Sequence, residues 1–470
     1  MRDAKQLHKQ IIGRVNANLC EFDFDTGVFS NNTIEYDKLA KFYSLYGITS
    51  HHPTMFNFIH SCMAGSYFLG KCFVGTSIVY KSDVRGDELR REGDVFDDKN
   101  SLSLLKDETI AITYSFLYKT LVHNYSHNPG TPEEFTIQNT ISAHYANIHG
   151  TTVGGCFLGA FSTVDLMSLH SCIVGEFSYI QAKELFHKRV EPGLIWIKSD
   201  DFEFKYSFSN DILDKYIGVN EVFNPRGIIY NFVKELEPEF DKVFDSVHVD
   251  ALDIPESSAV NKYSVIKGDT QIGENVFVSQ KAYLDSATMG DGSNSQENSY
   301  IINSKLKGLN VTAHGAKIIN SDMGRKVFVG FNSFLRGGKD ARLSVGDGCV
   351  IMPHTIIDIK TPVKIPEKHL IWGFIQSRDD LKTNSIALSS VIESKGALSR
   401  GQMMFTGDGN IFINSFADRI DHILDGNGAY FDGKGSRGHA QNDKHISFNT
   451  IQPYTSGDNK GIYPSISIEP

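Results

Sequence analysis

The chain has 470 residues, of which 40% are hydrophobic and 22% charged, and 56 acidic against 46 basic residues give a formal net charge of −10. These values are typical of a globular protein with a sizeable core, and the negative charge argues against nucleic acid or an anionic membrane surface as the main partner. The sequence has no apolar run long enough for a membrane span, no apolar segment typical of a signal peptide, and six cysteines without a CxxC pair. We therefore expect a cytoplasmic protein of two or three domains.

The first half of the chain begins with a mixed, partly helical segment over residues 1–50. A short unit then repeats over residues 51–200, as in "FVGTSIVYKSDVRGD", "TVGGCFLG" and "CIVGEFSYIQA". Residues 201–252 form a connector, in which "GIIYNFVKELEPEFDKVFDSV" (227–247) has apolar residues at a spacing close to that of a helix. This spacing predicts an amphipathic helix, which could cover one end of a repeat array.

The repeat resumes over residues 253–377, for example in "KVFVGFNSFLRGG" and "LSVGDGCVIMPHTII". It stops in the C-terminal extension, residues 378–470, where "NIFINSFADRIDHIL" (410–424) predicts one further helix. The end of the chain is rich in Gly, Asp and Asn, and we expect it to form loops.

The repeated unit is six residues long, since aliphatic residues recur at that interval at Ile272, Val278 and Leu284, and again at Met323, Val329 and Leu335. A period of six fits neither a helix nor a simple hairpin and is typical of a parallel β-helix built from hexapeptides. Three hexads make one triangular coil of about 18 residues, with each aliphatic side chain pointing inward. An ordinary β-sandwich is the alternative, and the Ile/Val-Gly hexads make it less favoured.

Three histidines form the candidate metal site: His127, His144 and His149. On a coil of about 18 residues, the separation between His127 and His144 brings the chain back to nearly the same corner, one coil further on. His149 lies five residues beyond His144, up to roughly 16 Å along an extended chain, so a neighbouring subunit would have to complete the set. The spacing therefore indicates an oligomer as well as a metal ion.

Residues 51–200 resemble the γ-class carbonic anhydrases and their hexapeptide-repeat transferase relatives. The resemblance rests on "NTISAHYANIHG", on the hexads that follow it, on "VEPGLIWI" (190–197) and on "DVRGDE" (83–88). It implies a mainly β protein with two left-handed parallel β-helix (hexapeptide-repeat) domains and flanking helices. It also implies a homotrimer with zinc, or another divalent ion such as Fe²⁺ or Co²⁺, at each subunit interface.

The resemblance assigns a role to each site residue. His127 and His149 of one chain and His144 of the next would bind the metal, and a metal-bound hydroxide would hydrate CO2 to bicarbonate; this is carbonic anhydrase chemistry, which the general description of metal-ion catalysis uses as its own example. Arg85 would orient an anion, Asp87 would be its partner and Glu88 a proton shuttle. His123 is the reserve ligand. The chain departs from the family where Lys119, Leu121 and Val122 replace an Asn-x-Gln-Asp motif, and where an insertion over 88–112 separates Arg85 from His127.

The second repeat resembles a degenerate copy of the first. His314 matches the middle metal ligand, but Ile302 and Ile319 stand where the other two are expected, so this copy is expected to be structural or to bind substrate. We therefore predict one metal ion per chain.

Two other functions stay open, because the fold alone does not decide among them. The chain could be a hexapeptide-repeat acyltransferase that uses acyl-CoA, with His314 or His354 as the general base and no metal. It could also be a non-catalytic β-helix scaffold. The three histidines separate these readings, since only the metal enzyme requires them.

Overall fold

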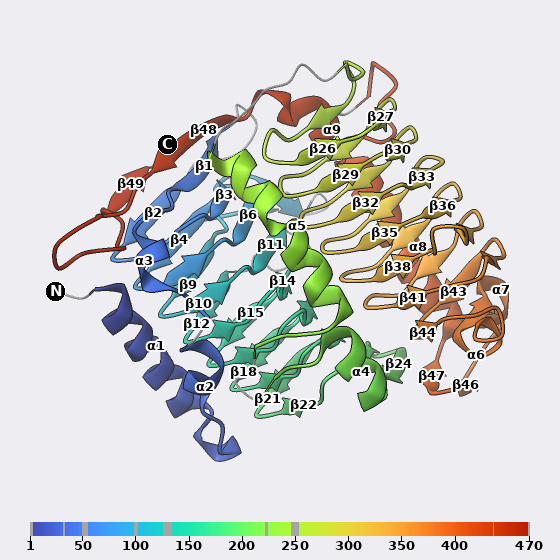
Figure 1. Cartoon of the computed structure of the whole chain (residues 1–470), viewed down its shortest axis with the longest axis horizontal. Helices are drawn as coiled ribbons and strands as arrows, with labels where there is room; N and C mark the ends of the chain where they lie inside the picture. Colours follow the sequence, from blue (N-terminus) through green and yellow to red (C-terminus); the bar gives the residue numbers. More distant parts are fainter. Residues whose placement is uncertain are drawn as a thin grey trace. The chain divides into compact units, whose positions relative to one another are not determined.

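The computed structural model describes residues 3–31, 33–48, 55–97, 102–125, 134–220, 224–245, 253–435 and 437–468. These residues form two compact units. Unit 1 comprises Met1–Leu194, Leu213–Gly227 and Ile446–Pro470, and unit 2 comprises Ile195–Ile212 and Ile228–His445. In Figure 1 the strands of unit 1 are blue to green and those of unit 2 are mainly yellow to orange. The predicted boundaries at residues 50, 200, 252 and 377 stay predictions.

The β-helix of unit 1 has three sheets, which we name 1A, 1B and 1C. Sheet 1A contains β48 (Ser447–Ile451), β1 (Ser44–Ile48), β3 (Tyr67–Gly70), β6 (Asp83–Glu88), β11 (Leu121–Tyr125), β14 (Asn147–His149), β17 (Thr163–Asp165) and β20 (Tyr179–Gln181). Sheet 1B contains β49 (Ile466–Ile468), β2 (Phe56–Ile59), β4 (Cys72–Gly75), β9 (Ile110–Thr113), β12 (Phe135–Gln138), β15 (Thr152–Gly154), β18 (Ser168–His170) and β21 (Glu184–Phe186). Sheet 1C contains β5 (Ile78–Tyr80), β10 (Phe116–Tyr118), β13 (Ile141–Ser142), β16 (Phe157–Leu158), β19 (Ile173–Val174) and β22 (Arg189–Val190).

The hexads of unit 1 produce short parallel strands in strict register. Asn147 pairs with Thr163, sixteen residues further on, and Thr163 pairs with Tyr179 after the same interval. The aliphatic residue of each hexad, such as Ile148 or Val164, points into the coil and is fully buried. Burying such a side chain contributes about 1.5–3 kcal/mol, so the stacked hexads supply the core.

The coil turns its corners at residues with positive φ, as at Tyr145 (φ 58°) and Phe161 (φ 57°). Side chains other than glycine, Asn and Asp are uncommon in this conformation, and here it recurs rung after rung.

One rung of unit 1 is longer than the others. Phe116 pairs with Ile141 and Leu121 with Asn147, intervals of 25 and 26 residues, because the chain leaves the coil between β11 and β12. The predicted insertion leaves the coil one rung earlier, after Glu88, and includes a small hairpin of β7 (Val95–Asp97) and β8 (Leu102–Ser103). At its base the buried Lys71 ammonium lies 3.1 Å from Asp107 and donates to the Arg90 carbonyl at 2.6 Å.

Both ends of the chain cover the β-helix of unit 1. The N-terminal helices are α1 (Ala4–Asn18), α2 (Thr26–Ser30) and α3 (Tyr36–Leu39), in agreement with the expected helical character. The segment predicted to be loop contributes two strands instead, since β48 pairs antiparallel with β1 and β49 pairs antiparallel with β2. The loop prediction is wrong there because the first coil presents edge backbone groups that need hydrogen-bond partners.

Unit 2 is a second β-helix with sheets 2A, 2B and 2C. Sheet 2A contains β25 (Ala259–Val260), β28 (Phe277–Val278), β31 (Asn294–Ser295), β34 (Val311–Thr312), β37 (Phe328–Val329), β40 (Val350–Ile351), β43 (His369–Ile371) and the antiparallel β45 (Ser385–Ala387). Sheet 2B contains β26 (Val265–Lys267), β29 (Tyr283–Asp285), β32 (Tyr300–Ile302), β35 (Lys317–Ile319), β38 (Phe334–Arg336), β41 (Ile356–Asp358) and β44 (Phe374–Ile375). Sheet 2C contains β27 (Gln271–Ile272), β30 (Thr288–Met289), β33 (Lys305–Leu306), β36 (Ser321–Met323), β39 (Leu343–Val345) and β42 (Val363–Ile365).

The two predicted helices of unit 2 are confirmed. The connector forms α5 (Ile228–Asp245), whose Phe232 and Phe240 rings pack on Tyr300 of sheet 2B at 5.3 and 6.0 Å between centroids. The C-terminal extension forms α8 (Gly409–Gly426), in which Phe416 contacts Phe328 of sheet 2A. Each helix therefore covers one face of the coil with aromatic side chains.

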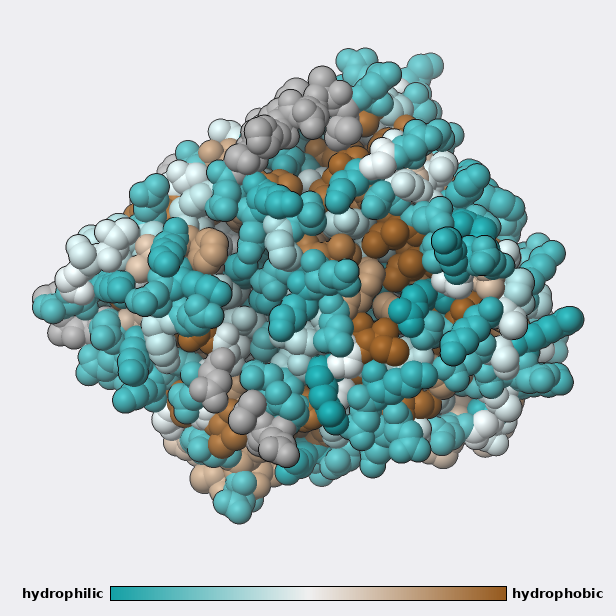
Figure 2. Space-filling view, in the orientation of Figure 1, coloured by the Kyte–Doolittle hydropathy of each residue, from teal (hydrophilic) through white to brown (hydrophobic). Residues whose placement is uncertain are grey.

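The fold class expected from the hexads is confirmed: the protein is mainly β, with two left-handed parallel β-helices of the hexapeptide-repeat type. The inward hexad residues Val278, Leu284, Val329 and Leu335 belong to one buried cluster in unit 2. The face drawn in Figure 2 is largely hydrophilic, with separate hydrophobic areas. Within the described ranges, no helix is both long enough and apolar enough to cross a bilayer.

Candidate active site

A row of polar side chains crosses sheet 1A on its outer face. Residues alternate along each strand, so the residue after the inward aliphatic one points outward. The strand register places Arg85 of β6 beside His123 of β11, His123 beside His149 of β14, and His149 beside Asp165 of β17. Adjacent parallel strands lie about 4.8 Å apart, which is close enough for the side chains in the row to contact one another.

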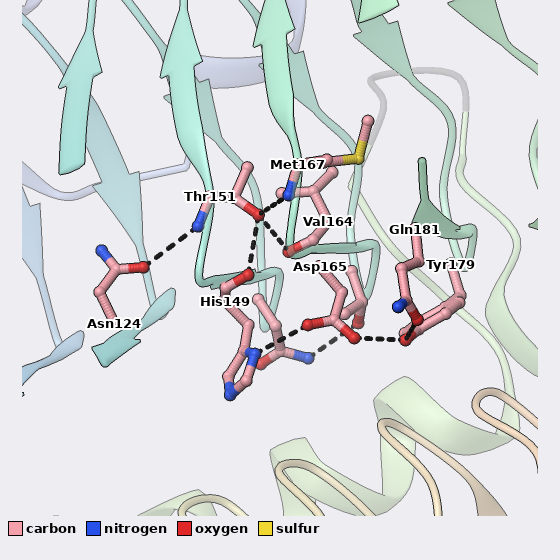
Figure 3. Close-up of polar contacts among 10 residues, drawn as sticks. Asn124, His149, Thr151, Val164, Asp165, Met167, Tyr179 and Gln181 are labelled. Atoms are coloured by element: carbon pink, nitrogen blue, oxygen red, sulfur yellow. Dashed lines mark hydrogen bonds and ion pairs between the residues drawn. The ribbon is translucent and has the colours of Figure 1, made fainter. Parts of the chain in front are cut away.

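His149 and Asp165 form the closest pair in this row. The Nδ1 atom of His149 lies 2.8 Å from Oδ1 of Asp165, as the close-up in Figure 3 shows. His149 is 5% exposed and Asp165 is fully buried. With Asp165 ionised, Nδ1 must carry the proton that it donates, so Nε2 of the neutral ring is the basic nitrogen.

Tyr179 and Gln181 of β20 hold the other side of the carboxylate. The Tyr179 hydroxyl donates to Oδ2 of Asp165 and lies 3.0 Å from Oε1 of Gln181 (Figure 3). The carboxylate therefore has a partner on each oxygen. This arrangement fixes both its orientation and that of the imidazole.

The backbone after His149 is also held in place. Thr151 donates its hydroxyl to the carbonyl of His149 at 2.8 Å, and its own N–H donates to Oδ1 of Asn124 at 3.2 Å (Figure 3). Beside the pair, Asn147 donates to Thr163 at 3.0 Å. The position of His149 thus depends on several hydrogen bonds and not on one contact.

The upstream part of the row contains Arg85, Asp87, Glu88 and His123. Arg85 makes a two-pronged ion pair with Asp87, at 3.1 and 2.7 Å, and both residues are buried. His123 lies 3.7 Å from Glu88 through Nε2, and its ring centroid lies 5.1 Å from that of His149. The structure therefore pairs Arg85 with Asp87 and places Glu88 near a histidine, while their catalytic roles stay predictions.

The predicted histidine set is only partly assembled in one chain. His127 lies outside the described residues. His144 stands at the corner after β13, with its ring at 4.3 Å from Tyr118 of the preceding rung, while His149 lies within sheet 1A beside His123. His144 belongs to no cluster of three potential metal ligands among the described side chains of unit 1. The subunit-shared metal site therefore stays a prediction.

The reason for this placement is the long rung. A return after 17 residues requires a coil of constant length, but the rung that contains His127 spans 25 or 26 residues. The residue one rung before His149 is consequently His123, the reserve ligand.

Asp165 and Tyr179 were not found from the sequence. They could have been, because "NIH" is followed at sixteen-residue intervals by "TVD" and "YIQ". The three segments share the pattern polar–aliphatic–polar, and the register places them side by side.

Unit 2 contains a second histidine–carboxylate pair. Nδ1 of His314 lies 2.8 Å from Oε2 of Glu297 one rung earlier, and both side chains are almost completely buried. His354 is a fully buried corner residue with φ 59°. Ile302 and Ile319 lie in sheet 2B, away from the corner that carries His314.

The His149–Asp165 pair has the geometry of a general base. An imidazole oriented by a buried carboxylate accepts a proton from a hydroxyl or amine and is stabilised as the imidazolium cation. Such a pair serves any reaction in which an oxygen or nitrogen nucleophile must lose a proton.

Comparison with known proteins places these observations in a family. Residues 100–221 match the family described as "Hexapeptide repeat including loop". The solved structure of a "putative acetyltransferase" from Desulfovibrio desulfuricans G20 is 50% identical, with a TM-score of 0.91 over 99% of this chain and 98% of that chain. A GDP-perosamine N-acetyl transferase from Caulobacter crescentus, a histidine-to-alanine mutant bound to CoA and GDP-perosamine, matches at 17% identity over 31% of this chain and 64% of that chain. Its TM-score of 0.13 carries no structural argument. No curated protein matches the chain.

These findings correct the leading functional prediction. The expected hydration of CO2 by a carbonic-anhydrase-like zinc lyase is wrong, because the protein that matches nearly the whole chain at 50% identity is named for acetyl transfer. CO2 and bicarbonate are likewise wrong as the expected substrate and product. The acyltransferase alternative agrees better with this relative. With 50% identity over 99% of its length, the chain belongs to the hexapeptide-repeat, left-handed β-helix transferase superfamily.

Proposed function

We propose that the chain is an acyltransferase that moves an acyl group from an acyl-CoA thioester to a hydroxyl or amine. The observation that carries the proposal is the 50% identity over 99% of the chain to a protein named for acetyl transfer. The buried His149–Asp165 pair supports it independently, because acyl transfer to a hydroxyl or amine needs a base at the nucleophile.

In the proposed reaction, Nε2 of His149 takes the proton of the acceptor as its oxygen or nitrogen attacks the thioester carbonyl carbon. A tetrahedral intermediate forms, the carbon–sulfur bond breaks, and the thiolate leaves. The imidazolium returns the proton to the sulfur, so the products are the acylated acceptor and free CoA thiol. Asp165 stays ionised throughout and stabilises the imidazolium, while Tyr179 holds Asp165 in place.

His149 is preferred as the base over His314 and His354, which the sequence suggested. Its carboxylate partner has a hydrogen-bonding tyrosine on its second oxygen, and its residue is 5% exposed against 1% for His314 and 0% for His354. His314 with Glu297 is the second candidate, and His314→Ala is compared with His149→Ala in every assay below.

We keep two further expectations as part of the proposal. Hexapeptide-repeat resemblance favours a homotrimer, and light scattering of the purified protein measures its mass directly. A metal ion bound through His144 and His149 is checked by elemental analysis of the same sample. The base chemistry above does not depend on either result.

The experiment that tests the function measures thiol release from acetyl-CoA in the presence of amino sugars, hydroxyl sugars and simple amines. His187→Ala is the matched control, since His187 is an exposed histidine of unit 1 at 57% side-chain exposure. We expect acceptor-dependent thiol release by the wild type and by the control. Absence of acetyl-CoA binding at about 1 mM, at the upper end of ordinary KM values, together with no thiol release, would overturn the proposal.

A further inference from the structure

A small cavity lies in unit 1 at the corner between sheets 1C and 1A. Its polar lining includes His144, Glu176 and the hydroxyls of Ser30 and Thr33, and its apolar lining includes Phe29, Phe116, Phe157, Ala143, Ala160, Val219 and Pro225. The volume is about 20 Å³, which is room for one water-sized group. α2 and the following residues form one wall, as the blue helices beside the unit 1 strands in Figure 1 indicate.

The repeat explains why the space exists. His144, Ala160 and Glu176 occupy the same corner position on three successive rungs, since Phe161 donates to the His144 carbonyl and Phe177 donates to the Ala160 carbonyl. The alanine between the two larger side chains leaves a gap over its methyl group. His144 and Glu176 therefore face the same cavity from about two strand spacings apart.

The groups around the cavity are hydrogen-bond acceptors. Ser30 already donates its hydroxyl proton to the Thr26 carbonyl at 3.0 Å, and Thr33 donates to the Phe29 carbonyl at 2.8 Å. Both hydroxyl oxygens thus present lone pairs, and a carboxylate at Glu176 adds two more. The rings of Phe29 and Phe157, 4.7 Å apart, add aromatic faces, which attract cations.

From this combination of size, acceptors and aromatic faces, we infer that the His144–Glu176 cavity binds the ammonium head of a small primary amine. An ammonium group has the size of a water molecule and carries three donors, which matches the acceptor-rich lining. A carboxylate that loses water on burial is stabilised when a cation replaces that water. This site does not depend on the acyltransferase proposal.

The environment of Glu176 agrees with a missing cation. Burial raises the pKa of its carboxyl above the ordinary value, while its own backbone N–H and Arg189 of the next rung act weakly in the other direction. The remaining titratable groups at the cavity are His144 and Tyr118, because Phe29, Ser30, Thr33, Val219 and Pro225 do not ionise in this range. An ammonium ligand favours the ionised carboxylate, so its apparent Kd should fall about tenfold per pH unit below the Glu176 pKa and level off above it.

The test uses methylammonium chloride as the probe and titrates the full-length protein by calorimetry and thermal denaturation. Sodium chloride at equal ionic strength and tetramethylammonium chloride, whose methyl shell is too large for the cavity, are the comparison salts. We expect methylammonium alone to bind and to raise the melting temperature. Glu176→Gln should weaken binding at least about tenfold, while the exposed Glu184→Gln should leave it unchanged.

Ala160→Val gives a second variant that fills the cavity without altering charge, and it should also abolish binding. Equal responses to the three salts in the wild type would mean that the cavity holds a water molecule only and would overturn the inference. So would methylammonium binding that Glu176→Gln and Ala160→Val leave intact.

Discussion

His149 and Asp165 lie at the same position of adjacent parallel strands, with Nδ1 of the histidine 2.8 Å from Oδ1 of the aspartate. The contact follows from the sixteen-residue rung, which places every third-of-strand residue beside its counterpart one coil later. Since the coil repeats so regularly, the pair needs no turn or hinge to form. The fold itself presents an oriented imidazole on the outer face of sheet 1A.

The first prediction concerns the carboxylate. Asp165→Asn keeps the size of the side chain but removes the charge that stabilises the imidazolium, and it allows the ring to adopt the wrong tautomer. We expect kcat for acyl transfer to fall by about 10²- to 10⁴-fold, the range of general-base contributions. Steady-state kinetics measure the loss, and circular dichroism checks that the fold is intact. A loss below about threefold in a folded variant would show that Asp165 does not assist the base.

The second prediction concerns Tyr179, a positioning residue that acts through Asp165. Tyr179→Phe removes the hydroxyl that donates to Oδ2 and leaves the ring in place. The carboxylate then becomes a stronger partner for His149, so the acidic limb of the pH–rate profile should move to higher pH, and kcat should fall by less than in Asp165→Asn. A profile that superimposes on that of the wild type would contradict this role.

The third prediction concerns stability at acidic pH. His8 of α1 packs at 4.6 Å between ring centroids from Phe116, and its Nδ1 lies 2.7 Å from the Tyr36 hydroxyl. Burial lowers the pKa of His8 from 6.5 to about 4. Because the folded pKa is lower than the unfolded one, its contribution to stability is complete above about pH 6.5 and is lost as the pH falls toward 4, at a cost of about 3 kcal/mol.

Urea unfolding of the wild type and of His8→Phe at pH 7 and pH 4 measures this contribution. The variant has no titrating group at this position, so it should lose less stability than the wild type between the two pH values. Equal losses in the two proteins would show that His8 does not titrate on unfolding.

The fourth prediction concerns the C-terminal strands. Deleting residues 446–470 removes β48 and β49 and leaves the backbone edges of β1 and β2 without their antiparallel partners. Exposed strand edges promote association between chains, so the deletion should lower the melting temperature and produce aggregates. Light scattering and thermal denaturation check this, with the exposed Tyr454→Ala as a control that keeps both strands. A monodisperse deletion variant with an unchanged melting temperature would contradict a covering role.

The fold could be predicted from the sequence because a six-residue period is a global property that local irregularities do not hide. Val278, Leu284, Val329 and Leu335 recur at that interval, and all of them point into the coil of unit 2. The helix over 227–247 was equally readable, since the aromatic face that contains Phe232 and Phe240 has helical spacing. The strands of the C-terminal extension were not readable, because β49 is only three residues long and forms on an edge made by β2.

The site was predicted only in part, for reasons of register. His149 was chosen correctly as a residue of the polar row, but its neighbour was not, because a coil of constant length was assumed. The excursion after Tyr125 lengthens one rung and brings His123 beside His149. Asp165 escaped notice because one aspartate after a valine has no distinctive local pattern. Its significance comes from the strand that pairs with it.

The most direct test of the central claim is acetyl transfer by His149→Ala, measured with and without added imidazole. The acceptor is whichever compound gives the highest thiol release with the wild type, and His187→Ala and His314→Ala are measured alongside. The account predicts a loss of about 10²- to 10⁴-fold in His149→Ala, partial recovery when imidazole replaces the missing ring, and no comparable loss in His187→Ala. Wild-type rates in a folded His149→Ala protein would contradict the account, and a loss confined to His314→Ala would move the base to unit 2.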